Sequence, residues 1–572
     1  MKVTDYIVSF FVSHNIRYIF GYQGGMITHL VDSISKSNDI QFIQCYHEQS
    51  ASIAAEGYAR ASGKFGVAIS TSGPGATNMI TGIANAYYDS IPVIYITGQV
   101  NTYEYKHQKP IRQMGFQETD IVSIVKSITK YAVMIEGEDR IKYELEKAVD
   151  IATTGRKGPV LLDIPMNIQR TDISPVDLSS YTDFYKKPLP DSLIVQEVIS
   201  LLHDADRPLV LCGGGVLTGK EKLNTFLLKT KLPYVVSLMG KGCVDETKKY
   251  FIGMIGSYGN RCANLAFSWA DVILVLGSRL DLRQTGNKNL GNWDKVKFVH
   301  VDIDINELND ASIKNKMLIH AYIEDFLYVL EKTKSTFTVK NDWIKFIMFL
   351  KEKYSQKNDI DRFLKYKTPY EALEQIGLTA DDGTIFTADI GQNQMWAAQT
   401  LQLKPDQMFF TSGGLAPMGY SLHSAIGAAF AFPEKKVICI IGDGGFHIAL
   451  QSLLLISQYK LNIMIFVLNN HALGMITQFQ TLYFESNMAG TTSDGGYEIP
   501  DIKYIAKACG LEYEHIDDVM NKKVPDFSRG KIVEIELNEL TTVVPKLEFN
   551  QPLYNMIPYL DADEIERLEN RK

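Results

Sequence analysis

The sequence predicts an α/β protein built from three doubly wound parallel-sheet domains. Apolar runs of strand length recur between helical patterns, and glycine-rich turns join strand to helix. The chain has 572 residues, 45% of them apolar, which is too long for one core and suits three domains of ordinary size. We expect domains at residues 1–168, 191–335 and 366–545, followed by a tail at 546–572.

The first domain alternates helices and strands from its beginning. Glycine turns interrupt the pattern at Gly21–Gly25 and Ser72–Gly75. Repeated strand, turn and helix in this order imply a parallel sheet with helices on both faces. The expected helices are Asp5–His14 and Ala51–Ala61, and the expected strands are Tyr18–Phe20, Ile40–Tyr46, Val67–Ser70, Val93–Thr97 and Val160–Ile164.

Glu48 follows the strand that ends at Tyr46 and precedes a helix, so we expect it at the carboxyl edge of the first sheet. One interpretation is a carboxylate favoured by the helix macrodipole. The other is a buried carboxylate that hydrogen-bonds a ligand ring and exchanges a proton with it, a role typically worth about 10²–10⁴ in rate. The residue pattern leaves both interpretations open.

A proline-containing linker is expected at residues 166–190, and a second, charged and helical linker at 336–367. Between them, the strands Leu209–Cys212, Val272–Leu276 and Phe298–Val301 predict another parallel sheet. The turn Gly213–Gly215 does not match G-x-G-x-x-G. A nucleotide-binding domain and a purely structural one are therefore both open.

The third domain contains the most specific pattern. The strand Val437–Ile441 leads into a Gly-Asp-Gly-Gly turn, and the strand Ile463–Leu468 is followed by two asparagines. Polar groups at the carboxyl ends of neighbouring parallel strands can converge on a phosphate and on Mg²⁺, which prefers oxygen ligands. We expect the carboxylate of Asp443, the amide oxygen of Asn470 and a backbone carbonyl near Ala472 to hold such an ion.

Several classes of function are disfavoured by composition. A net charge of −8 provides no basic surface for nucleic acid, and no apolar run is long enough to span a membrane. The opening residues do not resemble a signal peptide. Six scattered cysteines without C-x-x-C spacing suggest reduced thiols, so we expect a cytoplasmic protein.

The turn and asparagine pair are similar to the thiamine diphosphate signature, and further motifs extend the likeness across nearly the whole chain. Gly21–Gly25 is similar to G-Y-P-G-G, and His47-Glu48-Gln49 matches the glutamate motif. Gly391–Gln399 and Gly413–Gly419 resemble G-Q-H-Q-M-W-A-A-Q and G-G-L-G-T-M-G. The chain thus resembles the large subunits of thiamine-diphosphate-dependent acetohydroxyacid synthases (acetolactate synthases).

This resemblance implies a pyrimidine-binding first domain, a central Rossmann-like domain and a diphosphate-binding third domain. Glu48 would be the partner of the pyrimidine N1′, and Phe116 and Gln117 would line the substrate side together with the turn at Gly25. Asp443, Asn470 and Ala472 would hold Mg²⁺. The remaining cofactor-binding residues would be Gly391, Gln392, Asn393, Ala416, Met418, Gly442, Gly444, Gly445, Leu473, Gly474 and Met475, and a flavin adenine dinucleotide would meet Gly213, Gly214, Gly215, Arg279 and Asp302.

Some positions depart from the family pattern. Phe479 stands where the biosynthetic enzymes carry a tryptophan that helps to select the acceptor, which leaves the acceptor open. Tyr322 stands where an aspartate near the adenosine is expected, and flavin retention is left open. The other departures are Gln23 for proline, Met166 for lysine, Leu282 for aspartate and Asn393 for histidine.

The expected function is a carboligase that decarboxylates pyruvate and transfers a two-carbon unit to a second 2-oxo acid. A nucleotide-linked keto sugar is the alternative acceptor. A simple decarboxylase is disfavoured because His107 lacks a second adjacent histidine, and a non-catalytic homologue would be expected to lose Glu48, Asp443 or Asn470. The resemblance places Glu48 and the metal ligands of one site on different chains, which implies a homodimer or homotetramer.

Two histidines lie beside the metal motif, His447 and His471. Contact with an acceptor is one interpretation. Side chains next to such turns more often pack or face solvent, and the sequence does not decide between these roles.

Overall fold

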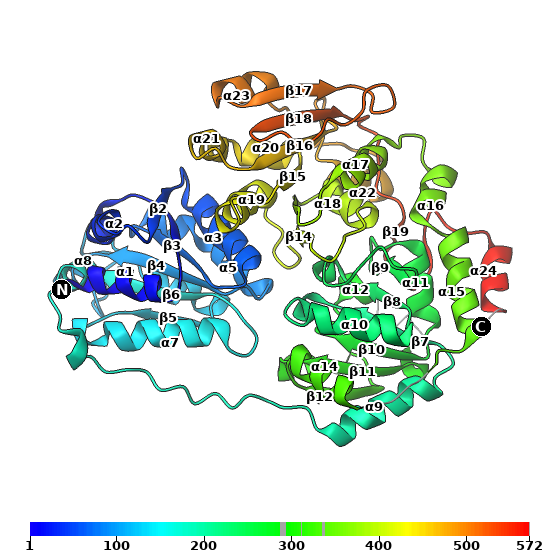
Figure 1. Ribbon diagram of the computed structural model, residues 1–572. Coiled ribbons are helices and arrows are strands. Elements are labelled where there is room, and N and C mark those ends of the chain that lie inside the picture. Colours follow the sequence, from blue (N-terminus) through cyan, green and yellow to red (C-terminus); the bar gives the residue numbers. More distant parts are fainter. Residues whose placement is uncertain (287–292, 311, 334–337, 571–572) are drawn as a thin grey trace.

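The computed structural model describes residues 1–286, 293–310, 312–333 and 338–570. It contains three parallel sheets of six strands each, flanked by helices, and a small antiparallel pair (Figure 1). The predicted fold class is confirmed. Within the described ranges, no helix has the length and apolar character needed to cross a membrane.

The first domain has the strand order β2-β1-β3-β4-β6-β5. Its central strands are buried along their whole length, as expected when helices cover both faces of a parallel sheet. The strands are β1 Tyr18–Tyr22, β2 Gln41–Gln44, β3 Gly66–Ser70, β4 Val93–Gln99, β5 Tyr131–Met134 and β6 Val160–Pro165; the helices are α1 Val3–Ser13, α2 Thr28–Ser35, α3 Glu48–Ser62, α4 Pro74–Asn78, α5 Ile80–Tyr88, α6 Ile121–Val125, α7 Ile141–Thr153 and α8 Met166–Gln169.

The central domain has the order β12-β11-β10-β7-β8-β9, which places the first strand of the domain in the middle of its sheet. Its strands are β7 Pro208–Cys212, β8 Tyr234–Val236, β9 Phe251–Met254, β10 Val272–Leu276, β11 Lys297–Asp302 and β12 Lys316–His320; its helices are α9 Ser192–Asp204, α10 Lys220–Thr230, α11 Arg261–Trp269, α12 Leu282–Thr285, α13 Ile305–Leu308 and α14 Ile323–Lys332. The predicted boundary at residue 335 and the start of the second linker at 336 lie outside the described residues.

The third domain follows α15 (Asn341–Lys353) and α16 (Gln356–Phe363), which confirm the helical character predicted for the second linker. Its strand order is β14-β13-β15-β16-β18-β17. The strands are β13 Ile385–Ala388, β14 Met408–Phe410, β15 Val437–Gly442, β16 Ile463–Asn469, β17 Glu512–Ile516 and β18 Lys531–Glu536; the helices are α17 Thr368–Thr379, α18 Gln392–Thr400, α19 Tyr420–Ala431, α20 Asp443–Ile448, α21 Leu453–Gln458, α22 Gly474–Tyr483 and α23 Ile502–Ala508.

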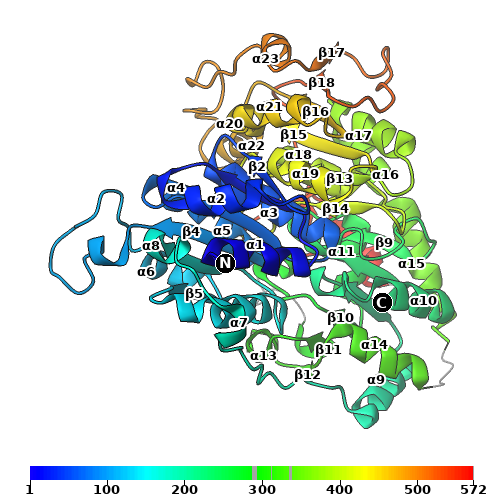
Figure 2. The ribbon, with the colours of Figure 1, turned by 60° about the vertical axis from the view of Figure 1, so that its left-hand side comes forward.

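The first and third domains pack directly on each other through α3 and α19, and one apolar core runs through both (Figures 1 and 2). Two glycines allow the close approach. A Cβ on Gly57 would lie 2.2 Å from the carbonyl oxygen of Ser424, and one on Gly427 would lie 1.9 Å from that of Ala54. Side chains at these positions would push the helices apart.

Local differences from the predicted elements have clear causes. The turn at residues 72–75 ends early because Pro74 begins the short helix α4. The first linker begins with α8 and then runs along the outside of the molecule to the central domain (Figure 1). The tail contains β19 (Lys546–Leu547), β20 (Met556–Ile557) and α24 (Ala562–Glu569), and it packs on the central domain, where Arg261 donates a hydrogen bond to the Met556 carbonyl at 3.1 Å.

Candidate active site

The pattern that predicts a metal site lies at the carboxyl ends of two adjacent strands. β15 and β16 pair in parallel with Gly442 opposite Leu468. Asp443 therefore begins α20 at the same edge of the sheet where Asn470 follows β16. Both side chains are buried, and the structure brings together the two residues that the sequence predicts to converge.

One carboxylate oxygen of Asp443 has its hydrogen-bonding capacity unused. Its Oδ1 accepts from the Gly444 N–H at 2.9 Å, whereas the buried Oδ2 has no partner among the described residues. Burial raises the pKa of Asp443 to about 6, outweighing the backbone N–H groups and the nearby Tyr497 hydroxyl, which favour the charged form. A buried, unsatisfied carboxylate oxygen is costly unless a cation or proton completes it, so the site fits Mg²⁺.

Glycines keep the space around these ligands open. A Cβ on Gly474 would lie 2.0 Å from Oε1 of Gln392 and 2.5 Å from Nδ2 of Asn470. A Cβ on Gly442 would approach Oδ1 of Asn393 to 3.2 Å. Gly391 precedes α18 with φ 111°, a conformation that favours glycine. Gln392 and Asn393 are thus brought to the start of a helix, where free backbone N–H groups favour a phosphate.

The loop before α19 meets the same edge. A Cβ on Gly444 would lie 2.9 Å from both the Met418 methyl group and the Leu473 side chain. Ala416 has φ 62°, and its N–H donates to the Ser412 hydroxyl at 2.9 Å. Met418 and Leu473, which the family resemblance assigns to the cofactor, therefore lie beside the turn at Gly442–Gly445.

Asp389 is a residue that sequence reasoning missed. Its buried carboxylate accepts from the N–H groups of Gly419 and Ser421, at 3.0 and 3.2 Å, and thereby fixes the start of α19. A Cβ on Gly445 would come within 3.1 Å of both its oxygens. Asp389 follows β13 at its carboxyl end, and this position is the sequence signal that could have identified it.

Met475, one of the predicted cofactor-binding residues, contacts the central domain. Its sulfur accepts a hydrogen bond from the Tyr258 hydroxyl at 3.2 Å.

Glu48 is the first residue of α3, and its side chain is 7% exposed. Oε2 accepts a hydrogen bond from Nδ2 of Asn78 at 2.9 Å. Oε1 lies 3.2 Å from the position that a Cβ on Gly75 would take. Glu48 thus begins a helix and is buried at the carboxyl edge of the sheet, a position that suits either interpretation.

The other residues predicted to line the substrate side are Gly25, Phe116 and Gln117. Gln117 has φ 64°, and its Cβ is 3.0 Å from the position of a Cβ on Gly73. Phe116 is 81% exposed. Gly25 begins a short helical turn beside open space. Among the described residues, no hydrogen bond or ion pair joins Glu48, Phe116 or Gln117 to Asp443 or Asn470; these two groups are the half-sites that the family resemblance predicts.

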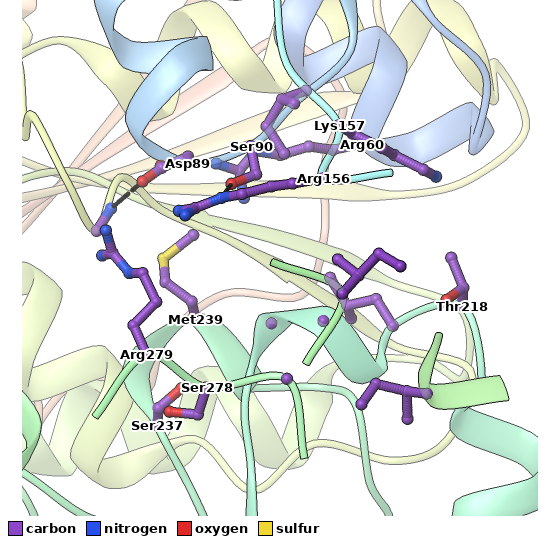
Figure 3. Close-up of a pocket in the computed structure, with 18 of the residues that line it drawn as sticks. Arg60, Asp89, Ser90, Arg156, Lys157, Thr218, Ser237, Met239, Ser278 and Arg279 are labelled. Atoms are coloured by element: carbon purple, nitrogen blue, oxygen red, sulfur yellow. Dashed lines mark hydrogen bonds and ion pairs between the residues drawn. The ribbon is translucent and has the colours of Figure 1, made fainter. Parts of the chain in front are cut away.

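A cavity of about 920 Å³ lies where the three domains meet. Of the five residues that the resemblance assigns to a flavin, Gly214, Gly215, Arg279 and Asp302 line this cavity, whereas Gly213 packs against Gly277. Burial raises the pKa of Asp302 to about 6. Figure 3 shows Arg60, Asp89, Ser90, Arg156 and Lys157 of the first domain on one side and Thr218, Ser237, Met239, Ser278 and Arg279 of the central domain on the other.

Tyr322 also lines the cavity, at the position where an aspartate is expected. Its hydroxyl accepts a hydrogen bond from the Gly155 N–H of the first domain at 2.8 Å. The departure thus replaces a carboxylate with a contact between domains.

The fold and the third-domain site define a thiamine-diphosphate-dependent enzyme. Residues 1–124 match the model of the thiamine pyrophosphate enzyme N-terminal TPP binding domain, residues 195–330 the central domain, and residues 389–529 the C-terminal TPP binding domain.

Curated relatives extend the match across the chain. The acetolactate synthase large subunit of Lactococcus lactis is 34% identical, with 97% of this chain and 96% of the relative covered. A probable acetolactate synthase large subunit of Methanocaldococcus jannaschii is 36% identical (91% and 89% covered), and isozyme 2 of Escherichia coli is 33% identical (95% and 97% covered). The chain therefore belongs to the acetolactate synthase large-subunit family.

Proposed function

We propose that the protein decarboxylates pyruvate and transfers the two-carbon unit to a second 2-oxo acid, with Mg²⁺ and thiamine diphosphate as cofactors. The observation that carries this proposal is the buried, partnerless Oδ2 of Asp443 beside Asn470. Bound thiamine diphosphate supplies the electron sink for the loss of carbon dioxide. Asp443, Asn470 and the Ala472 carbonyl would hold Mg²⁺ on its diphosphate, together with Gln392 and Asn393 at the start of α18.

Glu48 supplies the proton chemistry in this proposal. The Asn78 amide occupies Oε2, at 2.9 Å, which fixes the carboxyl group and leaves Oε1 to exchange a proton with the cofactor ring. Phe116 and Gln117 would bound the acceptor and exclude water.

Assembly of a complete site requires the two half-sites to meet, and we infer at least a homodimer in which Glu48 of one chain serves Asp443 of another. Mixing Glu48→Gln and Asp443→Ala variants under subunit exchange tests this. Half-sites shared between chains would restore activity, because a mixed dimer contains one intact site. Two inactive variants that stay inactive after proven exchange would contradict it.

The three-domain cavity supports a bound flavin adenine dinucleotide. Its volume lies within the range of about 300–1,000 Å³ usual for ligand pockets. Arginine and lysine side chains that line the cavity, among them Lys157 and Arg279, suit a diphosphate, and Asp302 suits ribose hydroxyls. The visible absorption band of flavin, sought after reconstitution and gel filtration, tests this.

We also propose that the protein is cytoplasmic, because a reducing compartment suits its six free thiols.

A keto sugar is a second candidate acceptor because of the aromatic surroundings of Phe479. Its ring centroid lies 4.8 Å from that of Tyr483 and 6.1 Å from that of Phe549. Aromatic faces suit sugar rings. The test is mass-spectrometric analysis of products from pyruvate alone, with other 2-oxo acids, and with nucleotide-linked keto sugars. Acetolactate from pyruvate alone supports the first proposal, an adduct only with a sugar supports the second, and acetaldehyde alone contradicts both.

A further inference from the structure

A group of side chains of the types that ligate metals lies on β17 and β18, two strands that the proposed reaction does not use. His515 of β17 and Glu534 and Glu536 of β18 place one donor atom each within 4.8 Å of one another. The strand register explains this cluster. His515 pairs with Glu534, and Glu536 lies two residues further along β18. Because side chains two residues apart share a face of a sheet, all three point to the same side.

His471 brings a fourth potential ligand to the cluster. Its Nε2 lies 2.7 Å from Oε1 of Glu536, while Nε2 of His515 lies 3.5 Å from Oε2 of the same carboxylate. Within the described ranges, no lysine or arginine forms an ion pair with Glu534 or Glu536. Two imidazoles and two carboxylates are thus gathered without a permanent cation.

We propose that His515, Glu534 and Glu536 form a binding site for a divalent transition metal, with Zn²⁺ as the preferred ion and His471, which contacts Glu536, as the side chain that supplies a fourth ligand on binding. Imidazole nitrogen and carboxylate oxygen in a four-ligand set suit Zn²⁺, with ligand distances of about 2.0–2.2 Å. The three clustered donors lie within 4.8 Å of one another, so movements of their side chains would bring them to such distances from one centre. The predicted Mg²⁺ site next to it offers oxygen ligands only, so ligand type separates the two ions.

Asn469 connects the cluster to the loop that carries the proposed Mg²⁺ ligands Asn470 and Ala472. Its Nδ2 donates to Oε1 of Glu534 at 2.6 Å, and its Oδ1 accepts from the His471 N–H at 3.0 Å. His471 has φ 52° and stands between Asn470 and Ala472. A zinc ion here would tie this turn to β17 and β18 and would stabilise the edge of the third domain.

The test uses the full-length chain, free of affinity tags and stripped of metal with a chelator. Zn²⁺ is titrated calorimetrically in excess Mg²⁺, and Co²⁺ serves as a probe because its visible spectrum reports a tetrahedral nitrogen and oxygen environment. We expect one Zn²⁺ per chain, the tetrahedral cobalt spectrum, and a higher Tm with Zn²⁺, since a ligand that binds only the folded state stabilises it.

His515→Asn and Glu536→Gln should each weaken Zn²⁺ binding by about 10-fold or more, and each should lose the zinc-dependent rise in Tm. Both side chains are partly exposed, so folding should survive, and circular dichroism checks this. His203→Asn, an exposed position on α9, is the matched control and should bind as the wild type does. No Zn²⁺ binding by the wild type in excess Mg²⁺, or equal binding by His515→Asn, would overturn the proposal. Neither result depends on turnover, so the proposed function stands or falls separately.

Discussion

The first and third domains have the same strand order, yet different chemistry stands at their carboxyl edges. In each sheet the first strand of the domain is the second strand from one side, and the last strand of the domain is the second from the other side. At the carboxyl ends of the strands, the first domain carries Glu48, at the start of α3. The third domain carries Asp443 and Asn470 there, after β15 and β16.

The contrast between the two acids shows what topology leaves undetermined. Topology places a ligand at the carboxyl edge in both domains. The neighbours then decide the role: an amide fixes Glu48 through Oε2, whereas Oδ2 of Asp443 is buried without a partner. The first arrangement suits exchange of a proton, and the second suits a cation.

Removing the third-domain carboxylate should have the largest effect. Asp443→Ala deletes the charged oxygen proposed to hold Mg²⁺, so Mg²⁺ and thiamine diphosphate binding should weaken together by about 100-fold or more. Isothermal titration calorimetry with both ligands measures this. Asp494→Ala, at an exposed position in the same domain, is the control and should bind normally. Unchanged binding of both ligands by Asp443→Ala would remove the metal assignment.

Replacing the first-domain acid should separate turnover from binding. Glu48→Gln keeps the shape and the contact with Asn78 but loses the proton-exchanging group, so turnover should fall by about 10²–10⁴ while the cofactor Kd changes little. Steady-state kinetics and calorimetry distinguish the two quantities. Glu138→Gln, on an exposed turn of the same domain, should behave as the wild type. A Glu48→Gln enzyme with normal turnover would contradict the assignment.

Local sequence patterns predicted strand positions and the placement of polar residues at strand ends. β10 has the predicted bounds, Val272–Leu276, and β15 and β16 extend one residue beyond theirs. Apolar periodicity and glycine turns act over a few residues, so they can be read from the chain. The same logic of polar groups at strand ends located Asp443, Asn470 and Glu48.

Contacts between distant segments could not be predicted in this way. The anchoring of α19 by Asp389 and the contact of Met475 with Tyr258 depend on segments far apart in the chain. Gly57 and Gly427 likewise gave no local signal, because their need for a missing side chain arises only where α3 meets α19.

The interface between the first and third domains, where α3 packs against α19, provides the next test. In Gly427→Ala the new Cβ would lie 1.9 Å from the Ala54 carbonyl oxygen, so α3 and α19 must separate. Overpacking of this kind typically costs about 1–3 kcal/mol, occasionally more, and backbone on both sides places this site at the upper end. Urea denaturation measures the loss. Gly377→Ala, within α17 and facing the flexible end of Leu401 at 3.2 Å, should be neutral or stabilising.

The remaining effect depends on pH and concerns a buried acid on β6, the strand of the first domain that corresponds in position to β18. Asp163 accepts from the Thr97 hydroxyl at 2.7 Å and the Gln99 amide at 2.8 Å, and burial raises its pKa to about 7. Its unfolded value is near 3.8, so between about pH 4 and 7 the folded state holds the extra proton. The free energy of unfolding should therefore fall as pH rises through this window, by at most about 1.4 kcal/mol per pH unit.

Asp163→Asn should remove this contribution while largely preserving the shape of the side chain. The difference in unfolding free energy between the variant and the wild type isolates Asp163 from other buried acids, such as Asp389 and Asp443, whose pKa values burial raises to about 6. We expect the variant to gain stability relative to the wild type as pH rises from 4 to 7. Asp139→Asn, at an exposed position, should show no such trend. A constant difference for Asp163→Asn would mean that the carboxylate of Asp163 is ionised in the folded protein across this range, and the acid on β6 would then be stabilised as an anion by Thr97 and Gln99.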